Sequence, residues 1–258
     1  ITTTLERLIS RLKEKSSDLG SGISIQDEDS YTKKKKLVAF DLDGTLIDME
    51  PLDELAKIAG VGEEVAEVTK LAMEGKIDFK DALTKRVSLL KNLPLEKAEA
   101  LKKSIKLNMG TRDLVKELKK AGFVIAIITG GFDVFADYVG DKLGVNYVYA
   151  NRLGVKNSVL TGEFKGRIVS PQSKLEALLE IAQKEGISLD ECVAVGDGVN
   201  DLSILKSSGL GIGYKPKRKV KRYVNAITNS KDLRTITALI GGGDIKKDVI
   251  RKLKKPLT

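Results

Sequence analysis

Histidine is absent from this sequence of 258 residues, tryptophan is absent as well, and there is a single cysteine. Without histidine the chain holds no Ser-His or Cys-His catalytic pair and no histidine-ligated zinc site. Acid-base chemistry near neutral pH therefore falls to carboxylates, lysine or tyrosine. The single cysteine, Cys192, excludes an intrachain disulfide framework, and we expect it to be a small buried side chain in its apolar run.

Long apolar segments are missing too, since no run approaches the roughly 20 residues that a membrane-spanning helix needs. The first residues also lack the apolar region of a signal peptide, so we expect a cytoplasmic protein with no membrane partner. The formal net charge is +9, but the basic residues lack interleaved aromatic side chains and form no nucleic-acid motif. We therefore expect no nucleic-acid partner, and a basic surface that helps to gather anionic substrates.

Strand-like and helix-like segments alternate along the chain, which predicts an α/β fold with a Rossmann-like parallel sheet at its core. Residues 37–40 are four apolar residues bounded by charge, a pattern typical of a strand buried on both faces of such a sheet. Further strands are expected at 123–128, 147–150, 192–195, 210–212 and 226–228, helices at 112–121, 133–143, 171–184 and 232–240, and a hairpin at the sheet edge over 153–164.

Four parts are expected along the chain. A small helical cap domain is predicted after the first strand, because the segment before strand character returns is longer than a βαβ crossover needs. The amphipathic pattern of residues 3–15 predicts a helix that packs on the main body or pairs with a second copy, which leaves a homodimer open. The parts are 1–32, the N-terminal helix and linker; 33–47 and 111–240, the Rossmann-like catalytic core; 48–110, the cap, with helices near 51–59, 63–74, 78–91 and 95–106; and 241–258, a basic C-terminal tail.

Polar residues follow three of the expected strands at the point where each strand ends. Asp41 and Asp43 come after the first, Thr129 and Gly130 after the second, and Asp197 after the strand at 192–195. Each of these endings alone is typical of an ordinary turn. Because the carboxyl ends of parallel strands meet at one edge of a sheet, we expect the three groups to converge in one crevice.

The chemistry of these groups indicates phosphoryl transfer. The three aspartates offer only hard oxygen ligands, which suit Mg²⁺ and disfavour zinc. The hydroxyl of Thr129, the backbone N–H of Gly130 and the ammonium of Lys174 are phosphate-binding groups. A carboxylate beside such groups can attack phosphorus to form an aspartyl-phosphate, while a second carboxylate protonates the leaving alcohol and later deprotonates water.

The order of these motifs resembles that of the haloacid dehalogenase superfamily over about residues 34–236. By that resemblance Asp41 is the nucleophile and Asp43 the general acid and base. Thr129 and Gly130 would bind the phosphoryl oxygens, and Lys174 would hold nucleophile and phosphate together. The motifs are Asp41-x-Asp43-Gly44-Thr45, Thr129-Gly130-Gly131, Lys174 and Gly196-Asp197-Gly198-Val199-Asn200-Asp201.

The same resemblance implies Mg²⁺ as the cofactor. Asp197 would complete the metal site with the Asp41 side chain and the Asp43 carbonyl. Asn200, which also lies at the substrate, and Asp201 would orient those ligands from behind.

The expected cap resembles that of the phosphoserine phosphatase family, through Glu50, the segment 72–79 and the segment 85–90. By that resemblance Glu50 meets the serine ammonium and Arg86 its carboxylate, while Met73 and Phe79 wall the pocket. Without the resemblance, these would be read as a core-facing Met and Phe beside ordinary surface charges.

The implied function is Mg²⁺-dependent hydrolysis of O-phospho-L-serine to L-serine and phosphate, a reaction of serine biosynthesis, with a small phosphomonoester as the partner. Two alternatives stay open: a phosphatase of the same mechanism for another small phosphorylated metabolite, and a catalytically silent binding protein that keeps the fold.

Overall fold

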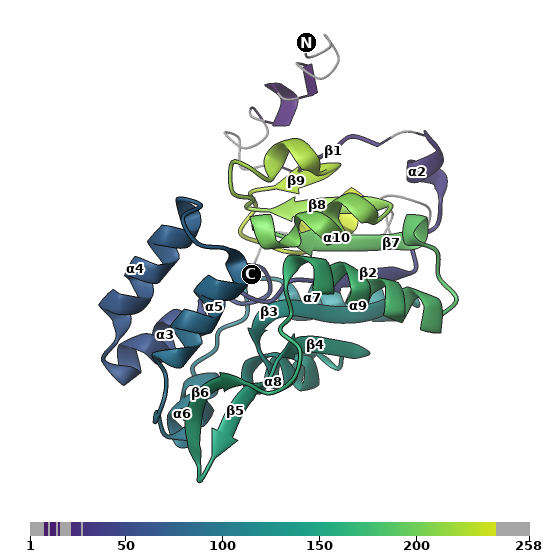
Figure 1. Cartoon of the computed structure of the whole chain (residues 1–258). Coiled ribbons are helices and arrows are strands. Elements are labelled where there is room, and N and C mark those ends of the chain that lie inside the picture. The colour runs from purple at the N-terminus through teal and green to yellow at the C-terminus, as the bar shows by residue number, and fades with distance from the viewer. Residues whose placement is uncertain (1–7, 10, 14, 16–21, 27, 241–258) are drawn as a thin grey trace, which may run out of the picture.

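The computed structural model describes residues 8–9, 11–13, 15, 22–26 and 28–240. In this part of the chain a seven-stranded sheet has the order β1-β9-β8-β7-β2-β3-β4, and β5 and β6 form a separate pair (Figure 1). The predicted α/β class and parallel sheet are confirmed, with β1 as an antiparallel edge strand. The strands are β1 (Gly22–Ser24), β2 (Leu37–Phe40), β3 (Val124–Phe132), β4 (Tyr147–Asn151), β5 (Leu153–Lys156), β6 (Val159–Phe164), β7 (Cys192–Gly196), β8 (Leu210–Tyr214) and β9 (Ala226–Thr228).

The central strand β2 is buried on both faces, as its unbroken apolar run predicts. Its side chains alternate: Val38 and Phe40 pack with α7, α8 and α11, whereas Leu37 and Ala39 pack with α9 and α10. This gives three layers around one sheet. The covering helices are α7 (Thr111–Lys120), α8 (Asp133–Leu143) and α11 (Thr235–Ile240) on one face and α9 (Pro171–Lys184) and α10 (Leu202–Ser207) on the other.

A helical segment follows β2 and lies beside one end of the sheet (Figure 1, blue). Its boundaries have local causes: Pro51 opens α3, Gly60 ends it at φ 74°, and the Asp78 carboxylate accepts the Asp81 N–H at 2.8 Å to cap α5. The helices are α3 (Pro51–Ala59), α4 (Gly62–Met73), α5 (Phe79–Ser88) and α6 (Leu95–Lys103).

The N-terminal segment differs from the prediction. Where the Ser- and Gly-rich composition of residues 16–32 predicted a linker, the structure has β1 and the short helix α2 (Glu28–Thr32). β1 pairs with the edge of β9, and this pairing supplies the backbone partners that its three residues cannot supply locally. Of the helix expected at 3–15, residues 8, 9, 11–13 and 15 are described and helical. Lys13 is buried and donates to the Val224 carbonyl at 2.6 Å, which attaches this helix to the main body.

The hairpin was also expected in the wrong place. β5 and β6 do not extend the main sheet, whose edge on that side is β4. Instead, the Leu160 N–H donates to the Leu93 carbonyl at 2.8 Å, and the Asn92 N–H donates to the Leu160 carbonyl at 2.9 Å. The hairpin therefore packs against the helical segment 48–110. The loop before α6 supplies backbone hydrogen-bond partners for β6, and β4 does not.

No helix among the described residues is both long and apolar enough to cross a membrane. The C-terminal tail predicted at 241–258 lies outside the described residues.

Candidate active site

The candidate residues gather at the point in the sheet where the strand order reverses. β2 pairs with β3 on one side and with β7 on the other, so the carboxyl ends of these strands flank one crevice. The fit there is close: a Cβ on Gly131 would lie 2.7 Å from Asp43 Oδ2 and 3.2 Å from Thr129 Oγ1. Gly44, at φ 71°, turns the chain so that a Cβ would lie 3.4 Å from the carboxyl carbon of Asp197. The convergence predicted from three strand endings is thus present.

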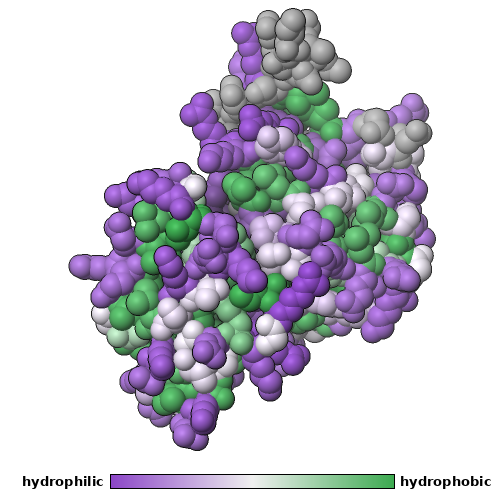
Figure 2. Space-filling view, viewed as in Figure 1, coloured by the Kyte–Doolittle hydropathy of each residue, from purple (hydrophilic) through white to green (hydrophobic). Residues whose placement is uncertain are grey.

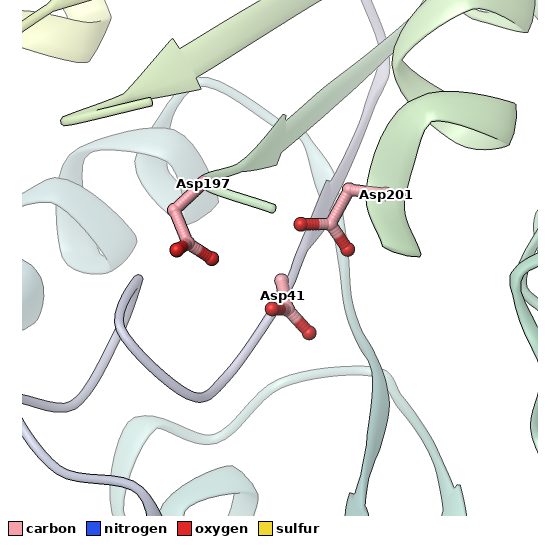
Figure 3. A group of neighbouring side chains, drawn as sticks. All are labelled: Asp41, Asp197 and Asp201. Carbon is pink, nitrogen blue, oxygen red and sulfur yellow. The ribbon is translucent and has the colours of Figure 1, made fainter. Parts of the chain in front are cut away.

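Three carboxylates, those of Asp41, Asp197 and Asp201, point toward one another at this edge (Figure 3). One oxygen from each lies within 4.8 Å of the others, so that together they could hold a metal ion. Asp201, which the resemblance assigned to a supporting position, contributes its carboxylate to this cluster directly. The side chain of Asp43 is not in the cluster, and its part in metal binding through the backbone carbonyl stays a prediction.

Lys174 donates hydrogen bonds to two of these carboxylates and so links them. The Ser170 hydroxyl caps α9 by accepting the Ser173 N–H at 3.2 Å, and Lys174 follows in the first turns. Its ammonium is 1% exposed and donates to Asp41 Oδ1 at 2.7 Å and to Asp201 Oδ1 at 2.6 Å. Burial alone lowers the pKa of Lys174, but the Asp201 and Asp41 carboxylates outweigh burial and raise it, so that the side chain stays charged.

Asp41 and Asp43 differ in a way that suits different roles. Burial and the neighbouring Asp201 raise the pKa of Asp41 to about 7, against the opposing effect of Lys174. Burial raises the pKa of Asp43 well above its ordinary value, reinforced by the charges of Asp41 and Glu50. Asp43 Oδ1 is buried without a hydrogen-bond partner among the described residues. A neutral Asp43 beside an ionised Asp41 is the arrangement that a general acid and a nucleophile need.

The end of β3, where its register with β4 shifts between Ile128 and Phe132, carries the expected phosphate-binding groups, and residues 129–131 are here called the phosphate-binding turn. Thr129 is 1% exposed, and its hydroxyl oxygen accepts the Gly131 N–H at 2.9 Å, which leaves the hydroxyl proton to donate elsewhere. Helix α5 reaches this turn, because a Cβ on Gly130 would lie 3.6 Å from the Phe79 ring. Phe79 therefore lies against the site, as predicted, whereas Met73 is 77% exposed at the end of α4 and is not brought together with the other candidates.

The charged cap residue Glu50 lies near the aspartates, since its charge raises the pKa of Asp43. Glu50 occupies the N-cap position of α3 without a side-chain capping hydrogen bond, and burial raises its pKa against the effect of Lys217 and Arg86 nearby. The Arg86 guanidinium contacts Asp53 at 3.0 Å, and its buried Nε has no hydrogen-bond partner among the described residues. The contacts of Glu50 and Arg86 to an amino acid stay predictions, and the ion pair with Asp53 orients the arginine.

Lys217 was missed in the sequence analysis. Its ammonium lies 3.3 Å from Asp197 Oδ2, and its backbone N–H donates to the Asp197 carbonyl at 2.9 Å. The residue follows β8, so the rule applied to the other strand endings could have found it. Asn200 is only loosely placed, with its amide 3.4 Å from Asp201 Oδ1.

Fold and site together define a protein of the α/β class with a cluster of carboxylates and a buried lysine at the end of its central strand. Residues 38–206 match the haloacid dehalogenase-like hydrolase family, and the chain belongs to that family. A phosphoserine phosphatase of Methanocaldococcus jannaschii is 47% identical over 208 residues, 81% of this chain and 99% of the relative. Another, of Archaeoglobus fulgidus, is 43% identical over 86% of this chain, which spans 65% of that relative's length.

Solved structures agree. One described as a phospho-aspartyl intermediate analogue of phosphoserine phosphatase has a TM-score of 0.75 at 47% identity and covers 80% of this chain and 99% of its own. A hydrolase of the haloacid dehalogenase family from Salmonella enterica has a TM-score of 0.85 at 29% identity over 91% of this chain and 80% of its own. Within the hydrolase family, the chain is therefore a member of the phosphoserine phosphatases.

Proposed function

We propose that this protein hydrolyses O-phospho-L-serine to L-serine and phosphate in the cytoplasm, through an aspartyl-phosphate (acyl phosphate) intermediate on Asp41. The observation that carries the proposal is the hydrogen bond from the buried Lys174 to Asp41. Beside this pair lies Asp43, whose carboxyl group has a raised pKa and whose Oδ1 has no hydrogen-bond partner in the described part of the chain. The relatives named above support the choice of substrate.

Mg²⁺ is the proposed cofactor. The cluster of Asp41, Asp197 and Asp201 offers only carboxylate oxygens, the donors that this hard cation prefers, and the backbone carbonyl of Asp43 is a further candidate ligand. When bound, the cation would supply charge neutralisation for the phosphoryl group.

The chain's own residues then account for the two chemical steps. A carboxylate oxygen of Asp41 attacks phosphorus, the bond from phosphorus to the serine oxygen breaks, and Asp43 gives its proton to that oxygen. In the second step Asp43 takes a proton from the attacking water, and the bond between phosphorus and Asp41 breaks to release phosphate. Thr129 and Gly130 would donate to phosphoryl oxygens, and Lys174 would keep Asp41 oriented and reduce repulsion between anions.

A panel of phosphomonoesters, assayed with Mg²⁺ and with chelator, tests this proposal. We expect release of phosphate that depends on Mg²⁺ and is fastest from phosphoserine. A flat profile would favour a phosphatase for another small metabolite, and no release from any substrate would favour a silent binding protein.

Replacing Arg86 tests the contact to the substrate carboxylate. A charge-assisted hydrogen bond is worth roughly 1.5–3 kcal/mol, so for Arg86→Ala we expect kcat/KM for phosphoserine to fall about ten- to a hundredfold. Phosphoethanolamine, which lacks the carboxylate, should be hydrolysed nearly as well as by the wild type. Lys85→Ala, an exposed neighbour on α5, serves as the control. Equal losses on the two substrates would refute the assignment of Arg86.

Binding of the cation can be measured without turnover. A ligand at 100 times its dissociation constant stabilises the folded state by about 2.7 kcal/mol, so Mg²⁺ should raise the Tm of the wild type by several degrees. Asp197→Asn should lose most of this shift, because it removes a charged ligand. Asp190→Asn, on an exposed carboxylate paired with Lys33, should keep it. The same shift in all three proteins would place the cation elsewhere.

A further inference from the structure

Asn151 is a buried polar residue that neither the sequence motifs nor the proposed chemistry uses. It is the last residue of β4, lies opposite Phe132 of β3, and is 0% exposed. Buried side-chain amides are nearly always hydrogen-bonded, so the partners of Asn151 show which parts of the chain it holds together.

The nitrogen and the oxygen of the Asn151 side-chain amide each form a hydrogen bond with a backbone group of an active-site loop. Its Nδ2 donates to the Gly130 carbonyl at 2.7 Å, and its Oδ1 accepts the Val169 N–H at 2.6 Å. A carbonyl can only accept and an N–H can only donate, so these two partners fix the orientation of the amide. One side chain thus joins the phosphate-binding turn at the end of β3 to the loop before α9.

Each of the two loops positions a group of the proposed reaction. Gly130 lies in the phosphate-binding turn, between Thr129 and Gly131. The fit there is tight, because a Cβ on Gly131 would lie 2.7 Å from Asp43 Oδ2. Val169 directly precedes Ser170, the cap of the helix that carries Lys174. The loops touch there as well, because a Cβ on Gly130 would lie 3.8 Å from the Val169 carbonyl oxygen.

We propose that Asn151 is a positioning residue that sets the separation between the phosphate-binding turn and the Lys174 ammonium. The inference rests on the proposed function, because it assigns these two groups to one phosphoryl group. A displacement of about 1 Å between groups that act together in a transition state costs up to about a hundredfold in rate. The competing interpretation is that Asn151 only stabilises the end of β4.

The test compares two asparagines whose side chains hydrogen-bond to the backbone of β3. Asn151→Asp keeps the size of the side chain and the acceptor for the Val169 N–H, but when ionised it offers no donor to the Gly130 carbonyl. Asn146, which directly precedes β4, accepts the Ile125 N–H of β3 at 2.9 Å, so Asn146→Asp is the control. Asn151→Ser, which is smaller and uncharged, is the second test variant.

We measure kcat and KM for phosphoserine at saturating Mg²⁺, at a temperature well below the Tm of each variant. For both Asn151 variants we expect kcat to fall about 10- to 100-fold while KM changes less than about threefold, since the cap contacts to serine are retained. Asn146→Asp should match the wild type in both constants.

A kcat within twofold of the wild type in the folded Asn151 variants, or failure of both to fold, would make Asn151 a purely structural residue and overturn the proposal. The proposed substrate is judged separately, on the wild type. If the wild type prefers another phosphomonoester, the same ratio of variant to wild type is measured with that substrate. A wild type silent toward every phosphomonoester would overturn both.

Discussion

Asp41→Asn is expected to reduce phosphate release by at least about a thousandfold, because an amide oxygen is too weak a nucleophile to form the phosphorylated intermediate. The substitution leaves the shape of the side chain almost unchanged, and Lys174 keeps Asp201 as a partner at 2.6 Å. The loss therefore reports on chemistry and not on folding.

Two measurements make this result decisive. Circular dichroism and thermal unfolding should show a cooperative transition for Asp41→Asn, as for the wild type. Asp190→Asn, at the opposite end of the sheet from the site, should retain full activity. If Asp41→Asn kept even a tenth of the wild-type rate, Asp41 would not be the nucleophile.

Lys174→Met is expected to have the largest effect on stability. It leaves the carboxylates of Asp41 and Asp201, which are 3% and 0% exposed, without their shared cation. Removing one partner of a buried ion pair typically destabilises by about 3–5 kcal/mol, so the free energy of unfolding in metal-free buffer should fall by that amount. Activity should be lost as well, because Asp41 loses the group that orients it.

Lys35→Met provides the comparison for this variant. Lys35 is also buried, at 4% exposed, but it donates to the carbonyls of Ser30 and Asp190, at the far end of the sheet. The two acceptors that the structure shows are neutral carbonyls, so we expect a smaller decrease in stability than for Lys174→Met, and unchanged activity. Adding Asp201→Asn to Lys174→Met should recover part of the lost stability. If the double variant were no more stable than Lys174→Met, charge repulsion would not be the cause of the loss.

The helices and strands were largely predictable because local signals agree with the fold. An unbroken apolar run marks β2, and Pro51 and Gly60 bound α3. β1 and the position of the β5–β6 hairpin were not predictable. Their backbone partners, on β9 and on the segment near Leu93, come from residues far away in the sequence.

The sequence by itself determined the chemistry of the site: carboxylates without histidine, polar groups at three strand endings, and a lysine at the start of a helix. The rule that parallel strands end at one edge was sufficient to bring those groups together. The resemblance to a known cap pointed to Glu50, Phe79 and Arg86.

Only the tertiary structure decided how those groups are held. It turned Met73 to solvent, placed the Asp201 carboxylate beside Asp41, and brought Lys217 to Asp197. It also joined two active-site loops through Asn151. The physical reason is that a side chain's partners depend on the separation of whole elements in space, and neither periodicity nor motif spacing carries that distance.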